Sequence, residues 1–231
     1  MSCDLFYDDF ETGDLSLWDT NVGCAVISTS TYDGIYSADL KDTGDYLIKA
    51  HTGVLEIWAD FYWKPSSNWT GTAFSSLNFR CGGNELITIG MYASNSRINV
   101  YRATTKLADN GSSILTSDWQ HIQIYVYQDV TNGRVVVKHE GVTVIDFTGD
   151  THSNSGSFDS VRMGKCITFT NLYGVCYIDN FCLSSTGWSG ATTTTTTSSS
   201  SSTTTSSSSS STTTTTTTEP FQHLVFSVSG A

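Results

Sequence analysis

The residues best suited to chemistry lie in one ten-residue stretch, Val54–Trp63, which reads V-L-E-I-W-A-D-F-Y-W. The stretch alternates, and on a β-strand successive side chains point to opposite faces of the sheet. The apolar face would consist of Leu55, Ile57, Ala59 and Phe61. The other face would present two carboxylates and two aromatic rings, from Glu56, Trp58, Asp60 and Tyr62. Such a face predicts the floor of a groove for a polar ligand with flat sides.

Four later stretches alternate in the same way: Ala73–Cys81, Leu86–Tyr92, Arg97–Arg102 and Trp119–Tyr127. With the first stretch they predict one curved antiparallel sheet that has a core face and a polar, aromatic outer face. Sugars stack their C–H faces on aromatic rings and hydrogen-bond through their hydroxyls, so this outer face favours a carbohydrate ligand. Rings that only pair across strands to stabilise the sheet are the alternative. The further binding residues would be Asn78, Arg80, Tyr92, Tyr101, His121, Gln123 and Tyr125.

Catalysis on the same face has less support. Glycoside hydrolysis needs two carboxylates about 5–10 Å apart. Glu56 and Asp60 share a face, but four residues of strand separate their Cα atoms by about 13 Å. A lyase needs an acid and a base, commonly His and Tyr, and a group that neutralises a uronate; residues of these types are present, without a recognised spacing, at Arg80, Tyr101, His121, Gln123, Tyr125 and Tyr127.

The charge of the chain restricts its partners. The 231 residues include only eleven Lys and Arg and have a net charge of -11. A strongly acidic surface argues against nucleic acid and anionic membranes, and it leaves neutral glycans, cationic groups or divalent metals. No stretch approaches the ~18 apolar residues of a membrane span. The N-terminal residues have neither a basic nor an apolar region, so no signal peptide is predicted.

Composition divides the chain into three parts. Residues 1–190, rich in Thr, Tyr, Val and Ile, predict one all-β domain with almost no helix. Residues 191–219 form a linker in which every residue from Thr192 to Thr218 is Ser or Thr, and such a segment cannot build a core. Residues 220–231 would dock as a strand on a neighbouring structural subunit or begin a further domain. A head, a spacer and an apolar end predict a module displayed on an extracellular or virion surface.

Several segments resemble concanavalin A-like (laminin G-like) jelly-roll modules. They are F-Y-D-D-F-E-T-G-D-L-S-L-W, D-W-Q-H-I-Q-I-Y-V-Y, G-R-V-V-V-K-H-E-G-V-T-V-I-D-F and the closing Y-I-D-N-F-C-L-S. The resemblance covers most of residues 4–185. It implies a jelly-roll β-sandwich of two antiparallel sheets in which the first and last strands are adjacent.

Two features follow from that resemblance. Adjacent first and last strands would allow a disulfide between Cys3 and Cys182, although six cysteines without a C-x-x-C pair also fit buried thiols. Related modules often hold a structural calcium where these strands meet, and the candidate ligands here are Asp8, Asp9 and Asp179.

The superfamily contains lectins, adhesion modules, hydrolases and lyases, so the site decides the function. Its hydrolases often have a strand of the form E-x-D-x-E, whereas this chain reads Glu56-x-Trp58-x-Asp60. The missing central carboxylate disfavours an enzyme. We therefore expect a non-catalytic carbohydrate-binding or adhesion module. A decoration or filament subunit that buries these rings in a protein interface is the alternative, and a polysaccharide hydrolase or lyase is the third.

Overall fold

The computed structural model describes residues 3–40, 44–65, 74–152, 156–164 and 176–188. The chain divides into a compact unit, Met1–Thr192, and a second unit, Thr193–Ala231, that lies outside these ranges. The predicted linker at 191–219 and the predicted docking segment at 220–231 therefore lie outside the described residues as well. The described residues form strands and turns only, and they contain no helix suited to crossing a membrane.

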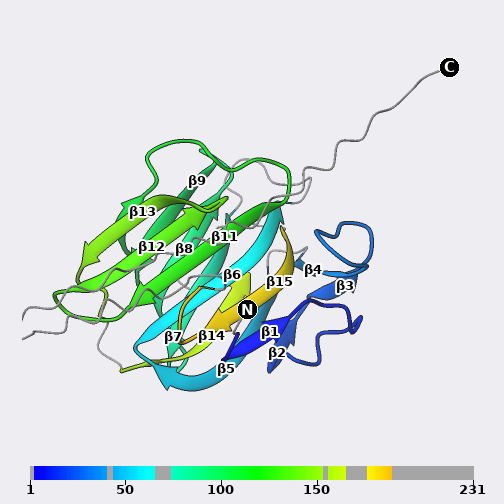
Figure 1. Cartoon of the computed structure of the whole chain (residues 1–231), viewed down its shortest axis with the longest axis horizontal. Coiled ribbons are helices and arrows are strands. Elements are labelled where there is room, and N and C mark those ends of the chain that lie inside the picture. The colour runs from blue at the N-terminus through cyan, green and yellow to red at the C-terminus, as the bar shows by residue number, and fades with distance from the viewer. Residues whose placement is uncertain (1–2, 41–43, 66–73, 153–155, 165–175, 189–231) are drawn as a thin grey trace, which may run out of the picture. The chain divides into compact units, whose positions relative to one another are not determined.

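Two antiparallel sheets form a sandwich, which confirms the predicted fold class (Figure 1). The eight-stranded sheet has the order β13 (Val142–Gly149), β12 (Gly133–His139), β11 (Gln120–Tyr127), β6 (Glu56–Pro65), β15 (Cys176–Ser184), β4 (Ser37–Leu40), β3 (Ala25–Ile27), with β1 (Phe6–Asp8) also on β15. The seven-stranded sheet has the order β10 (Thr105–Asp109), β9 (Arg97–Arg102), β8 (Asn84–Tyr92), β7 (Phe74–Cys81), β14 (Phe158–Gly164), β5 (Tyr46–Val54), β2 (Thr20–Val22).

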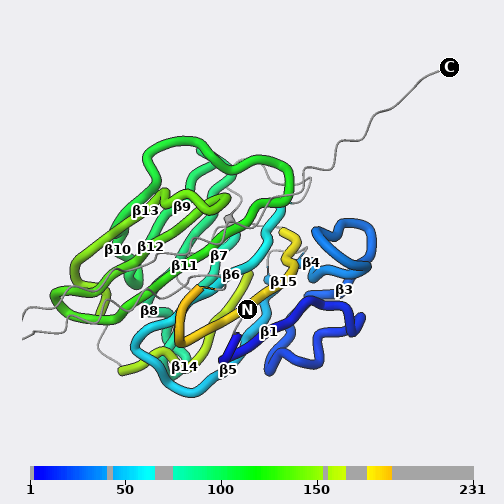
Figure 2. Tube along the Cα trace, in the orientation of Figure 1, coloured from blue at the N-terminus to red at the C-terminus, as the bar shows by residue number. Residues whose placement is uncertain are grey.

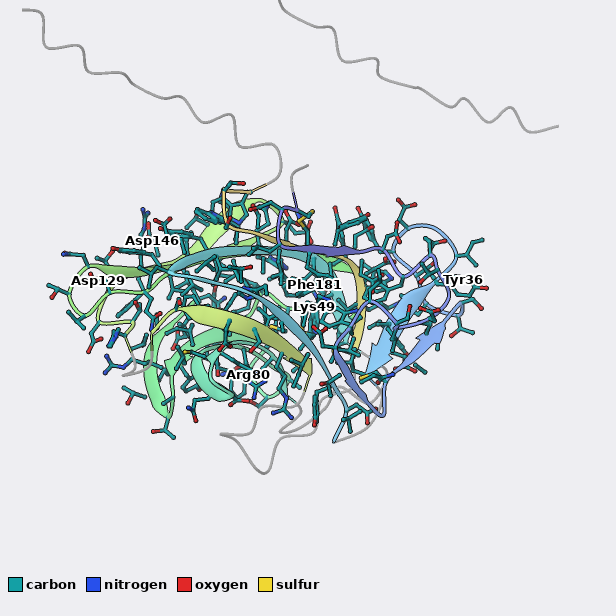
Figure 3. All side chains as sticks on the ribbon, turned by 90° about the horizontal axis from the view of Figure 1, so that it is seen from below. Tyr36, Lys49, Arg80, Asp129, Asp146 and Phe181 are labelled. Carbon is teal, nitrogen blue, oxygen red and sulfur yellow. A yellow bond between two sulfur atoms is a disulfide. The ribbon has the colours of Figure 1, made fainter. Side chains whose placement is uncertain are left out.

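The core lies between the sheets, where the alternating residues of both meet. Figure 3, turned by 90°, shows the two sheets as layers with side chains filling the space between them. The side chains of β6 that point inward are fully buried, as are the facing ones of β7 and β14. The largest of these buried residues are Trp63, Phe61, Phe79 and Phe158, and Phe181 of β15 is fully buried as well. Removing such large apolar surfaces from water is the main driving force for folding.

The first and last strands of the domain are neighbours, as the family resemblance implies (Figure 2). In the β1–β15 pair, Tyr7 lies opposite Cys182. Trp18 is buried and donates its indole N–H to Asp8 Oδ2 at 2.8 Å, which ties the N-terminal segment together. Its ring packs on Phe181 of β15, with centroids 5.1 Å apart. The N-terminal segment is thus held on the closing strand by strand pairing and by packing.

His139-Glu140-Gly141 lies between two stretches typical of strands and so predicts a hairpin, which the pairing of β12 with β13 confirms. Glu140 and Gly141 have φ values of 50° and 75°, so both adopt the left-handed conformation that a two-residue hairpin turn needs. The Asp33-Gly34 sequence at the centre of 32–36 also predicts a hairpin, and this segment does lie in the connection between two antiparallel neighbours, β3 and β4. The connection is a long loop and not a tight turn, because residues 32–35 form bends. Their backbone N–H groups bond to carboxylates instead of to a partner strand: Glu11 Oε1 accepts from Ile35 N and Tyr36 N, both at 2.9 Å.

Three further expectations need correction. Leu55 does not face the core, because it lies at the reversal between β5 and β6 and is 54% exposed. The strands β2 and β10 were not predicted, since both are short and carry polar residues. The five alternating stretches do not form one sheet: β6 and β11 belong to the eight-stranded sheet, and β7, β8 and β9 belong to the seven-stranded sheet.

Candidate functional site

The outer face of the eight-stranded sheet carries four side-by-side pairs of polar and aromatic residues. They follow from the register of β6 with β11, in which directly opposed residues point to the same face. The pairs are Glu56 with Tyr127, Trp58 with Tyr125, Asp60 with Gln123, and Tyr62 with His121. Seven of these eight residues were predicted as ligand-binding residues, and the fold brings those seven together on one surface.

Two clefts lie along this surface. The first, of about 410 Å³, is lined by Tyr7, Tyr32, Asp33, Asp60, Tyr62, His121, Gln123 and Asn180. The second, of about 380 Å³, is lined by Trp58, Tyr125, Arg134, Val136, Lys138, Thr143, Asp146 and Trp188. Asp60 in the first cleft and Trp58 in the second are neighbouring outward positions of β6, so the clefts adjoin.

A stack of rings forms one wall of the first cleft. Tyr62 stacks on Tyr32 at 3.4 Å between ring centroids and on His121 at 4.7 Å. Trp119 meets Tyr32 edge-on at 6.2 Å. Because Tyr62 stacks on two neighbours, it supports the wall, and Tyr32, which is 45% exposed, is the ring that the cleft offers to a ligand.

Asp60 holds the polar floor of the first cleft. Its two oxygens accept hydrogen bonds from His121 Nε2 at 2.5 Å and from Gln123 Nε2 at 2.9 Å. The bond to Asp60 raises the pKa of His121, against the opposing effect of burial. His121 therefore favours the protonated form in which Nε2 donates, and this nitrogen is not available as a general base.

Two phenols on the same surface stay protonated at neutral pH. Burial raises the pKa of Tyr62, with a smaller effect from the bond to Tyr32. Burial also raises the pKa of Tyr125 to about 12, and the charge of Glu56 adds to the shift. The Tyr125 hydroxyl donates to Glu56 Oε2 at 3.2 Å. Both rings thus act as apolar surfaces with a polar tip rather than as acids or bases.

The second cleft has an aromatic wall beside cationic side chains. Trp58 packs on Tyr125 with ring centroids 4.8 Å apart. The Arg134 guanidinium donates twice to the Asp146 carboxylate, from Nε at 2.9 Å and from Nη2 at 2.8 Å. Lys138 Nζ lies 3.7 Å from the centre of the Trp188 ring.

Four predicted binding residues lie elsewhere. Asn78, Arg80, Tyr92 and Tyr101 belong to the seven-stranded sheet, so their expected place beside Trp58 is wrong. Figure 3 shows Arg80 on the opposite layer from Asp146 of β13. Asn78 is fully buried and accepts from Thr88 Oγ1 at 2.8 Å, and the Tyr92 hydroxyl donates to Tyr101 at 2.9 Å. Alternation identified their outward direction, but it does not say which sheet a strand joins.

Several cleft residues were not predicted, because most lie outside the alternating stretches that defined the predicted site. Tyr32 and Asp33 belong to the segment expected to be a hairpin, and Asp179 Oδ2 holds this segment by accepting from their N–H groups at 2.9 and 3.2 Å. The other unpredicted lining residues are Tyr7, Asn180, Arg134, Val136, Lys138, Thr143, Asp146 and Trp188. For the three of these residues on β12, Arg134, Val136 and Lys138, the strand pattern of 133–138 could have indicated a shared face.

The disulfide between Cys3 and Cys182 is present, with Cα atoms 5.4 Å apart. It joins the N-terminal segment to the closing strand beside the β1–β15 pair. Cys24 and Cys176 are buried thiols, and burial raises the pKa of Cys176 to about 12. Thiols with raised pKa values are poor nucleophiles, which fits a structural role for these two residues.

The three proposed calcium ligands do not form a ligand set. Within the described ranges, no group of three or more His, Cys, Asp or Glu side chains is placed to hold a metal ion. Asp8 accepts from Phe10 N at 2.8 Å in addition to the Trp18 indole, and both oxygens of Asp179 accept backbone N–H groups. Asp9 accepts from Glu11 N at 3.2 Å. Calcium binding stays a prediction, and these contacts favour a structural role for the three carboxylates.

Comparisons with known proteins identify the fold and no family. No family model and no curated protein matches the chain. Among solved structures, the chain is similar to an endo-β-1,4-glucuronan lyase from the fungus Trichoderma reesei (TM-score 0.56, 15% identity, 77% of this chain and 94% of that one). It is also similar to the cellulose-induced protein Cip1 (TM-score 0.57, 14% identity, 78% of this chain and 97% of that one).

A sialidase matches with a TM-score of 0.54 and 14% identity over 79% of this chain. The match covers only 18% of the sialidase. At these identities the likeness concerns the β-sandwich fold alone. The clefts must therefore carry any argument about function.

Proposed function

We propose that this protein binds carbohydrate, without catalysis, along the two adjoining clefts of the eight-stranded sheet. The observation that carries the proposal is the juxtaposition of exposed and half-buried aromatic rings with hydrogen-bonding groups that are already held in place. Tyr32 and the Trp58–Tyr125 pair offer apolar faces. Asp60 and Gln123, which lie between them, hold polar atoms in fixed positions.

The length of the surface suits an oligosaccharide. The outward positions from Trp58 to Tyr62, on which Tyr32 stacks, extend over about 13 Å of strand, at ~3.3 Å per residue. A chain of several sugars can therefore contact Tyr32 at one end and Trp58 at the other. Preformed hydrogen bonds lower the entropy that ligand binding must otherwise offset.

Catalysis has less support from the same geometry. Glu56 and Asp60 are separated on the outer face of β6 by Trp58, so the two carboxylates do not flank one scissile bond. The Nε2 atom of His121 is engaged with Asp60. A lyase that removes a proton beside a uronate would need a free base at this position.

We also propose that the protein is displayed at an extracellular or virion surface. The Cys3–Cys182 disulfide supports this, because such bonds persist in oxidising compartments. The acidic surface and the Ser/Thr composition of 192–218 agree with a solvated, displayed module.

The test is a glycan-array screen of the full chain, followed by calorimetry of the strongest binders with and without calcium. Tyr32→Ala and Trp58→Ala should each weaken binding about tenfold or more, since an aromatic contact at a binding site is commonly worth ~1–2 kcal/mol. Tyr101→Ala on the other sheet is the control and should bind normally.

Three results would refute the proposal. The first is a folded wild-type protein that binds no glycan, which would favour the structural-subunit alternative. The second is weaker binding in Tyr101→Ala together with unchanged binding in the cleft variants, which would place the site on the seven-stranded sheet. The third is depolymerisation of a bound polysaccharide, which would show an enzyme.

A further inference from the structure

We propose that the second cleft recognises the acidic group of a charged sugar, with Lys138 as the residue that contacts it. This inference rests on the proposed function, because it assigns a ligand class to one part of the same surface. An anionic ligand at this cleft contrasts with the net negative charge of the whole chain, which would repel anions in general.

Lys138 lies where a sugar held by the aromatic wall would reach it. On β12 it is directly opposite Gln123 of β11 and Thr143 of β13. Gln123 is in turn opposite Asp60, so acid, amide and cation lie in one row across three strands. Neighbouring strands are about 4.8 Å apart, so the Cα atoms of Lys138 and Asp60, two strands apart, are separated by about 10 Å.

The ammonium group of Lys138 is positioned but not neutralised. It lies over the Trp188 ring at 3.7 Å, which restrains the flexible side chain by a cation–π contact. Among the ion pairs that the described residues form, those of the second cleft pair Arg134 with Asp146 and do not include Lys138. A cation beside an aromatic wall and without a carboxylate partner suits an anionic ligand group.

The two clefts differ in charge, and the difference would orient the ligand. The first cleft is lined by the carboxylates of Asp33 and Asp60, and Asp60 is hydrogen-bonded to His121. The second cleft contains two cations against the single carboxylate of Asp146. A sugar chain with an acidic group at one end would thus place that end in the second cleft and its neutral part along Asp60 and Tyr32.

Arg134 would make a second, weaker contact with the anion beside that of Lys138. Two of its five N–H donors are used by Asp146, and the pair is about half exposed. The remaining donors can reach a second oxygen of the same anion. The acidic group itself can be a carboxylate, as in uronic and sialic acids, or a sulfate ester, since both offer several acceptor oxygens.

The experiment compares matched acidic and neutral probes by calorimetry on the full chain. The pairs are sialyllactose with lactose, trigalacturonate with its carboxyl-reduced form, and sulfated lactose with lactose. We expect at least one acidic probe to bind about tenfold more tightly than its neutral partner, and Lys138→Gln to remove that preference, since a hydrogen bond to a charged group is worth ~1.5–3 kcal/mol. Lys106→Gln, on the other sheet, is the matched control.

The outcomes separate this inference from the proposed function. Neutral probes that bind through Trp58, with no acidic probe preferred, would overturn this inference alone. An acidic preference that survives in Lys138→Gln would also overturn it. If no probe and no array glycan binds the folded wild type, both proposals fail. The probe pair that shows the preference identifies the carboxylate or the sulfate as the group recognised.

Discussion

The hydrogen bond between His121 and Asp60 allows a sharp test of the first cleft, because both side chains are largely shielded from water. The side chain of Asp60 is 8% exposed and that of His121 is 24% exposed. The bond to Asp60 raises the pKa of His121 above its ordinary value of 6.5. The charged pair should therefore stabilise the folded state while His121 is protonated.

The raised pKa fixes the direction of the pH dependence. Below pH 6.5, His121 is protonated in both the folded and the unfolded chain, so the stabilisation is complete. As the pH rises through the raised pKa of the folded state, the proton is lost and the stabilisation with it. Removing the charge of Asp60 should consequently cost more at low pH than at high pH.

The perturbation is Asp60→Asn. Asp60 accepts from two donors, His121 and Gln123, and the single acceptor oxygen of Asn can serve only one of them. A hydrogen bond to a charged group contributes ~1.5–3 kcal/mol, so we expect the free energy of unfolding to fall by about 2 kcal/mol near pH ~5.5. Toward pH ~9 the loss should shrink to about 1 kcal/mol, the value of a neutral hydrogen bond.

The assay is urea unfolding of wild type and variant across this pH range, with the disulfide kept oxidised. The difference between the two proteins is the quantity to follow, because His139 adds a pH dependence of the opposite sign below pH 6.5. Burial lowers the pKa of His139, but its contribution is common to both proteins and cancels. In a His121→Gln background the cost of Asp60→Asn should not depend on pH. A cost that is constant or increases with pH in the wild-type background would refute the reasoning.

Three other substitutions or treatments test the fold. Reducing the Cys3–Cys182 disulfide, which closes a loop with a sequence separation of 179, should lower the free energy of unfolding by about 3 kcal/mol or more, and an unchanged urea midpoint would contradict this. Gly133→Ala would place a Cβ 1.9 Å from the Thr151 hydroxyl and should cost about 2 kcal/mol, whereas the control Gly44→Ala has open space and should be near neutral in the same assay. Trp18→Phe leaves a buried carboxylate oxygen without its indole donor, so calorimetry should show a lower melting temperature and a loss of about 2 kcal/mol.

Alternation predicted the face of each strand well, and the reason is physical. Ile57, Ala59 and Phe61 are fully buried, because a strand with one face in the core cannot shift its register by one residue without exposing its apolar set. Alternation carries no information about which strands pair with one another. Arg80 and Trp58 both point outward, yet they belong to different sheets, since pairing is decided by contacts between residues distant in the sequence.

The role of Asp179 shows why the first cleft could be predicted only in part. In the sequence, an acid on the closing strand of the domain is a candidate metal ligand, whereas in the structure the Asp179 oxygens accept from Tyr32 N, Asp33 N and Asn180 N. The bond to Tyr32 spans 147 residues of sequence, and no local pattern marks it. Burial raises the pKa of Asp179, and these N–H groups oppose the shift by stabilising its charged form. The carboxylate thus fixes the backbone that places the Tyr32 ring on Tyr62. A residue that the sequence suggests as a calcium ligand therefore has a positioning role in the wall of the first cleft, which no local sequence pattern indicates.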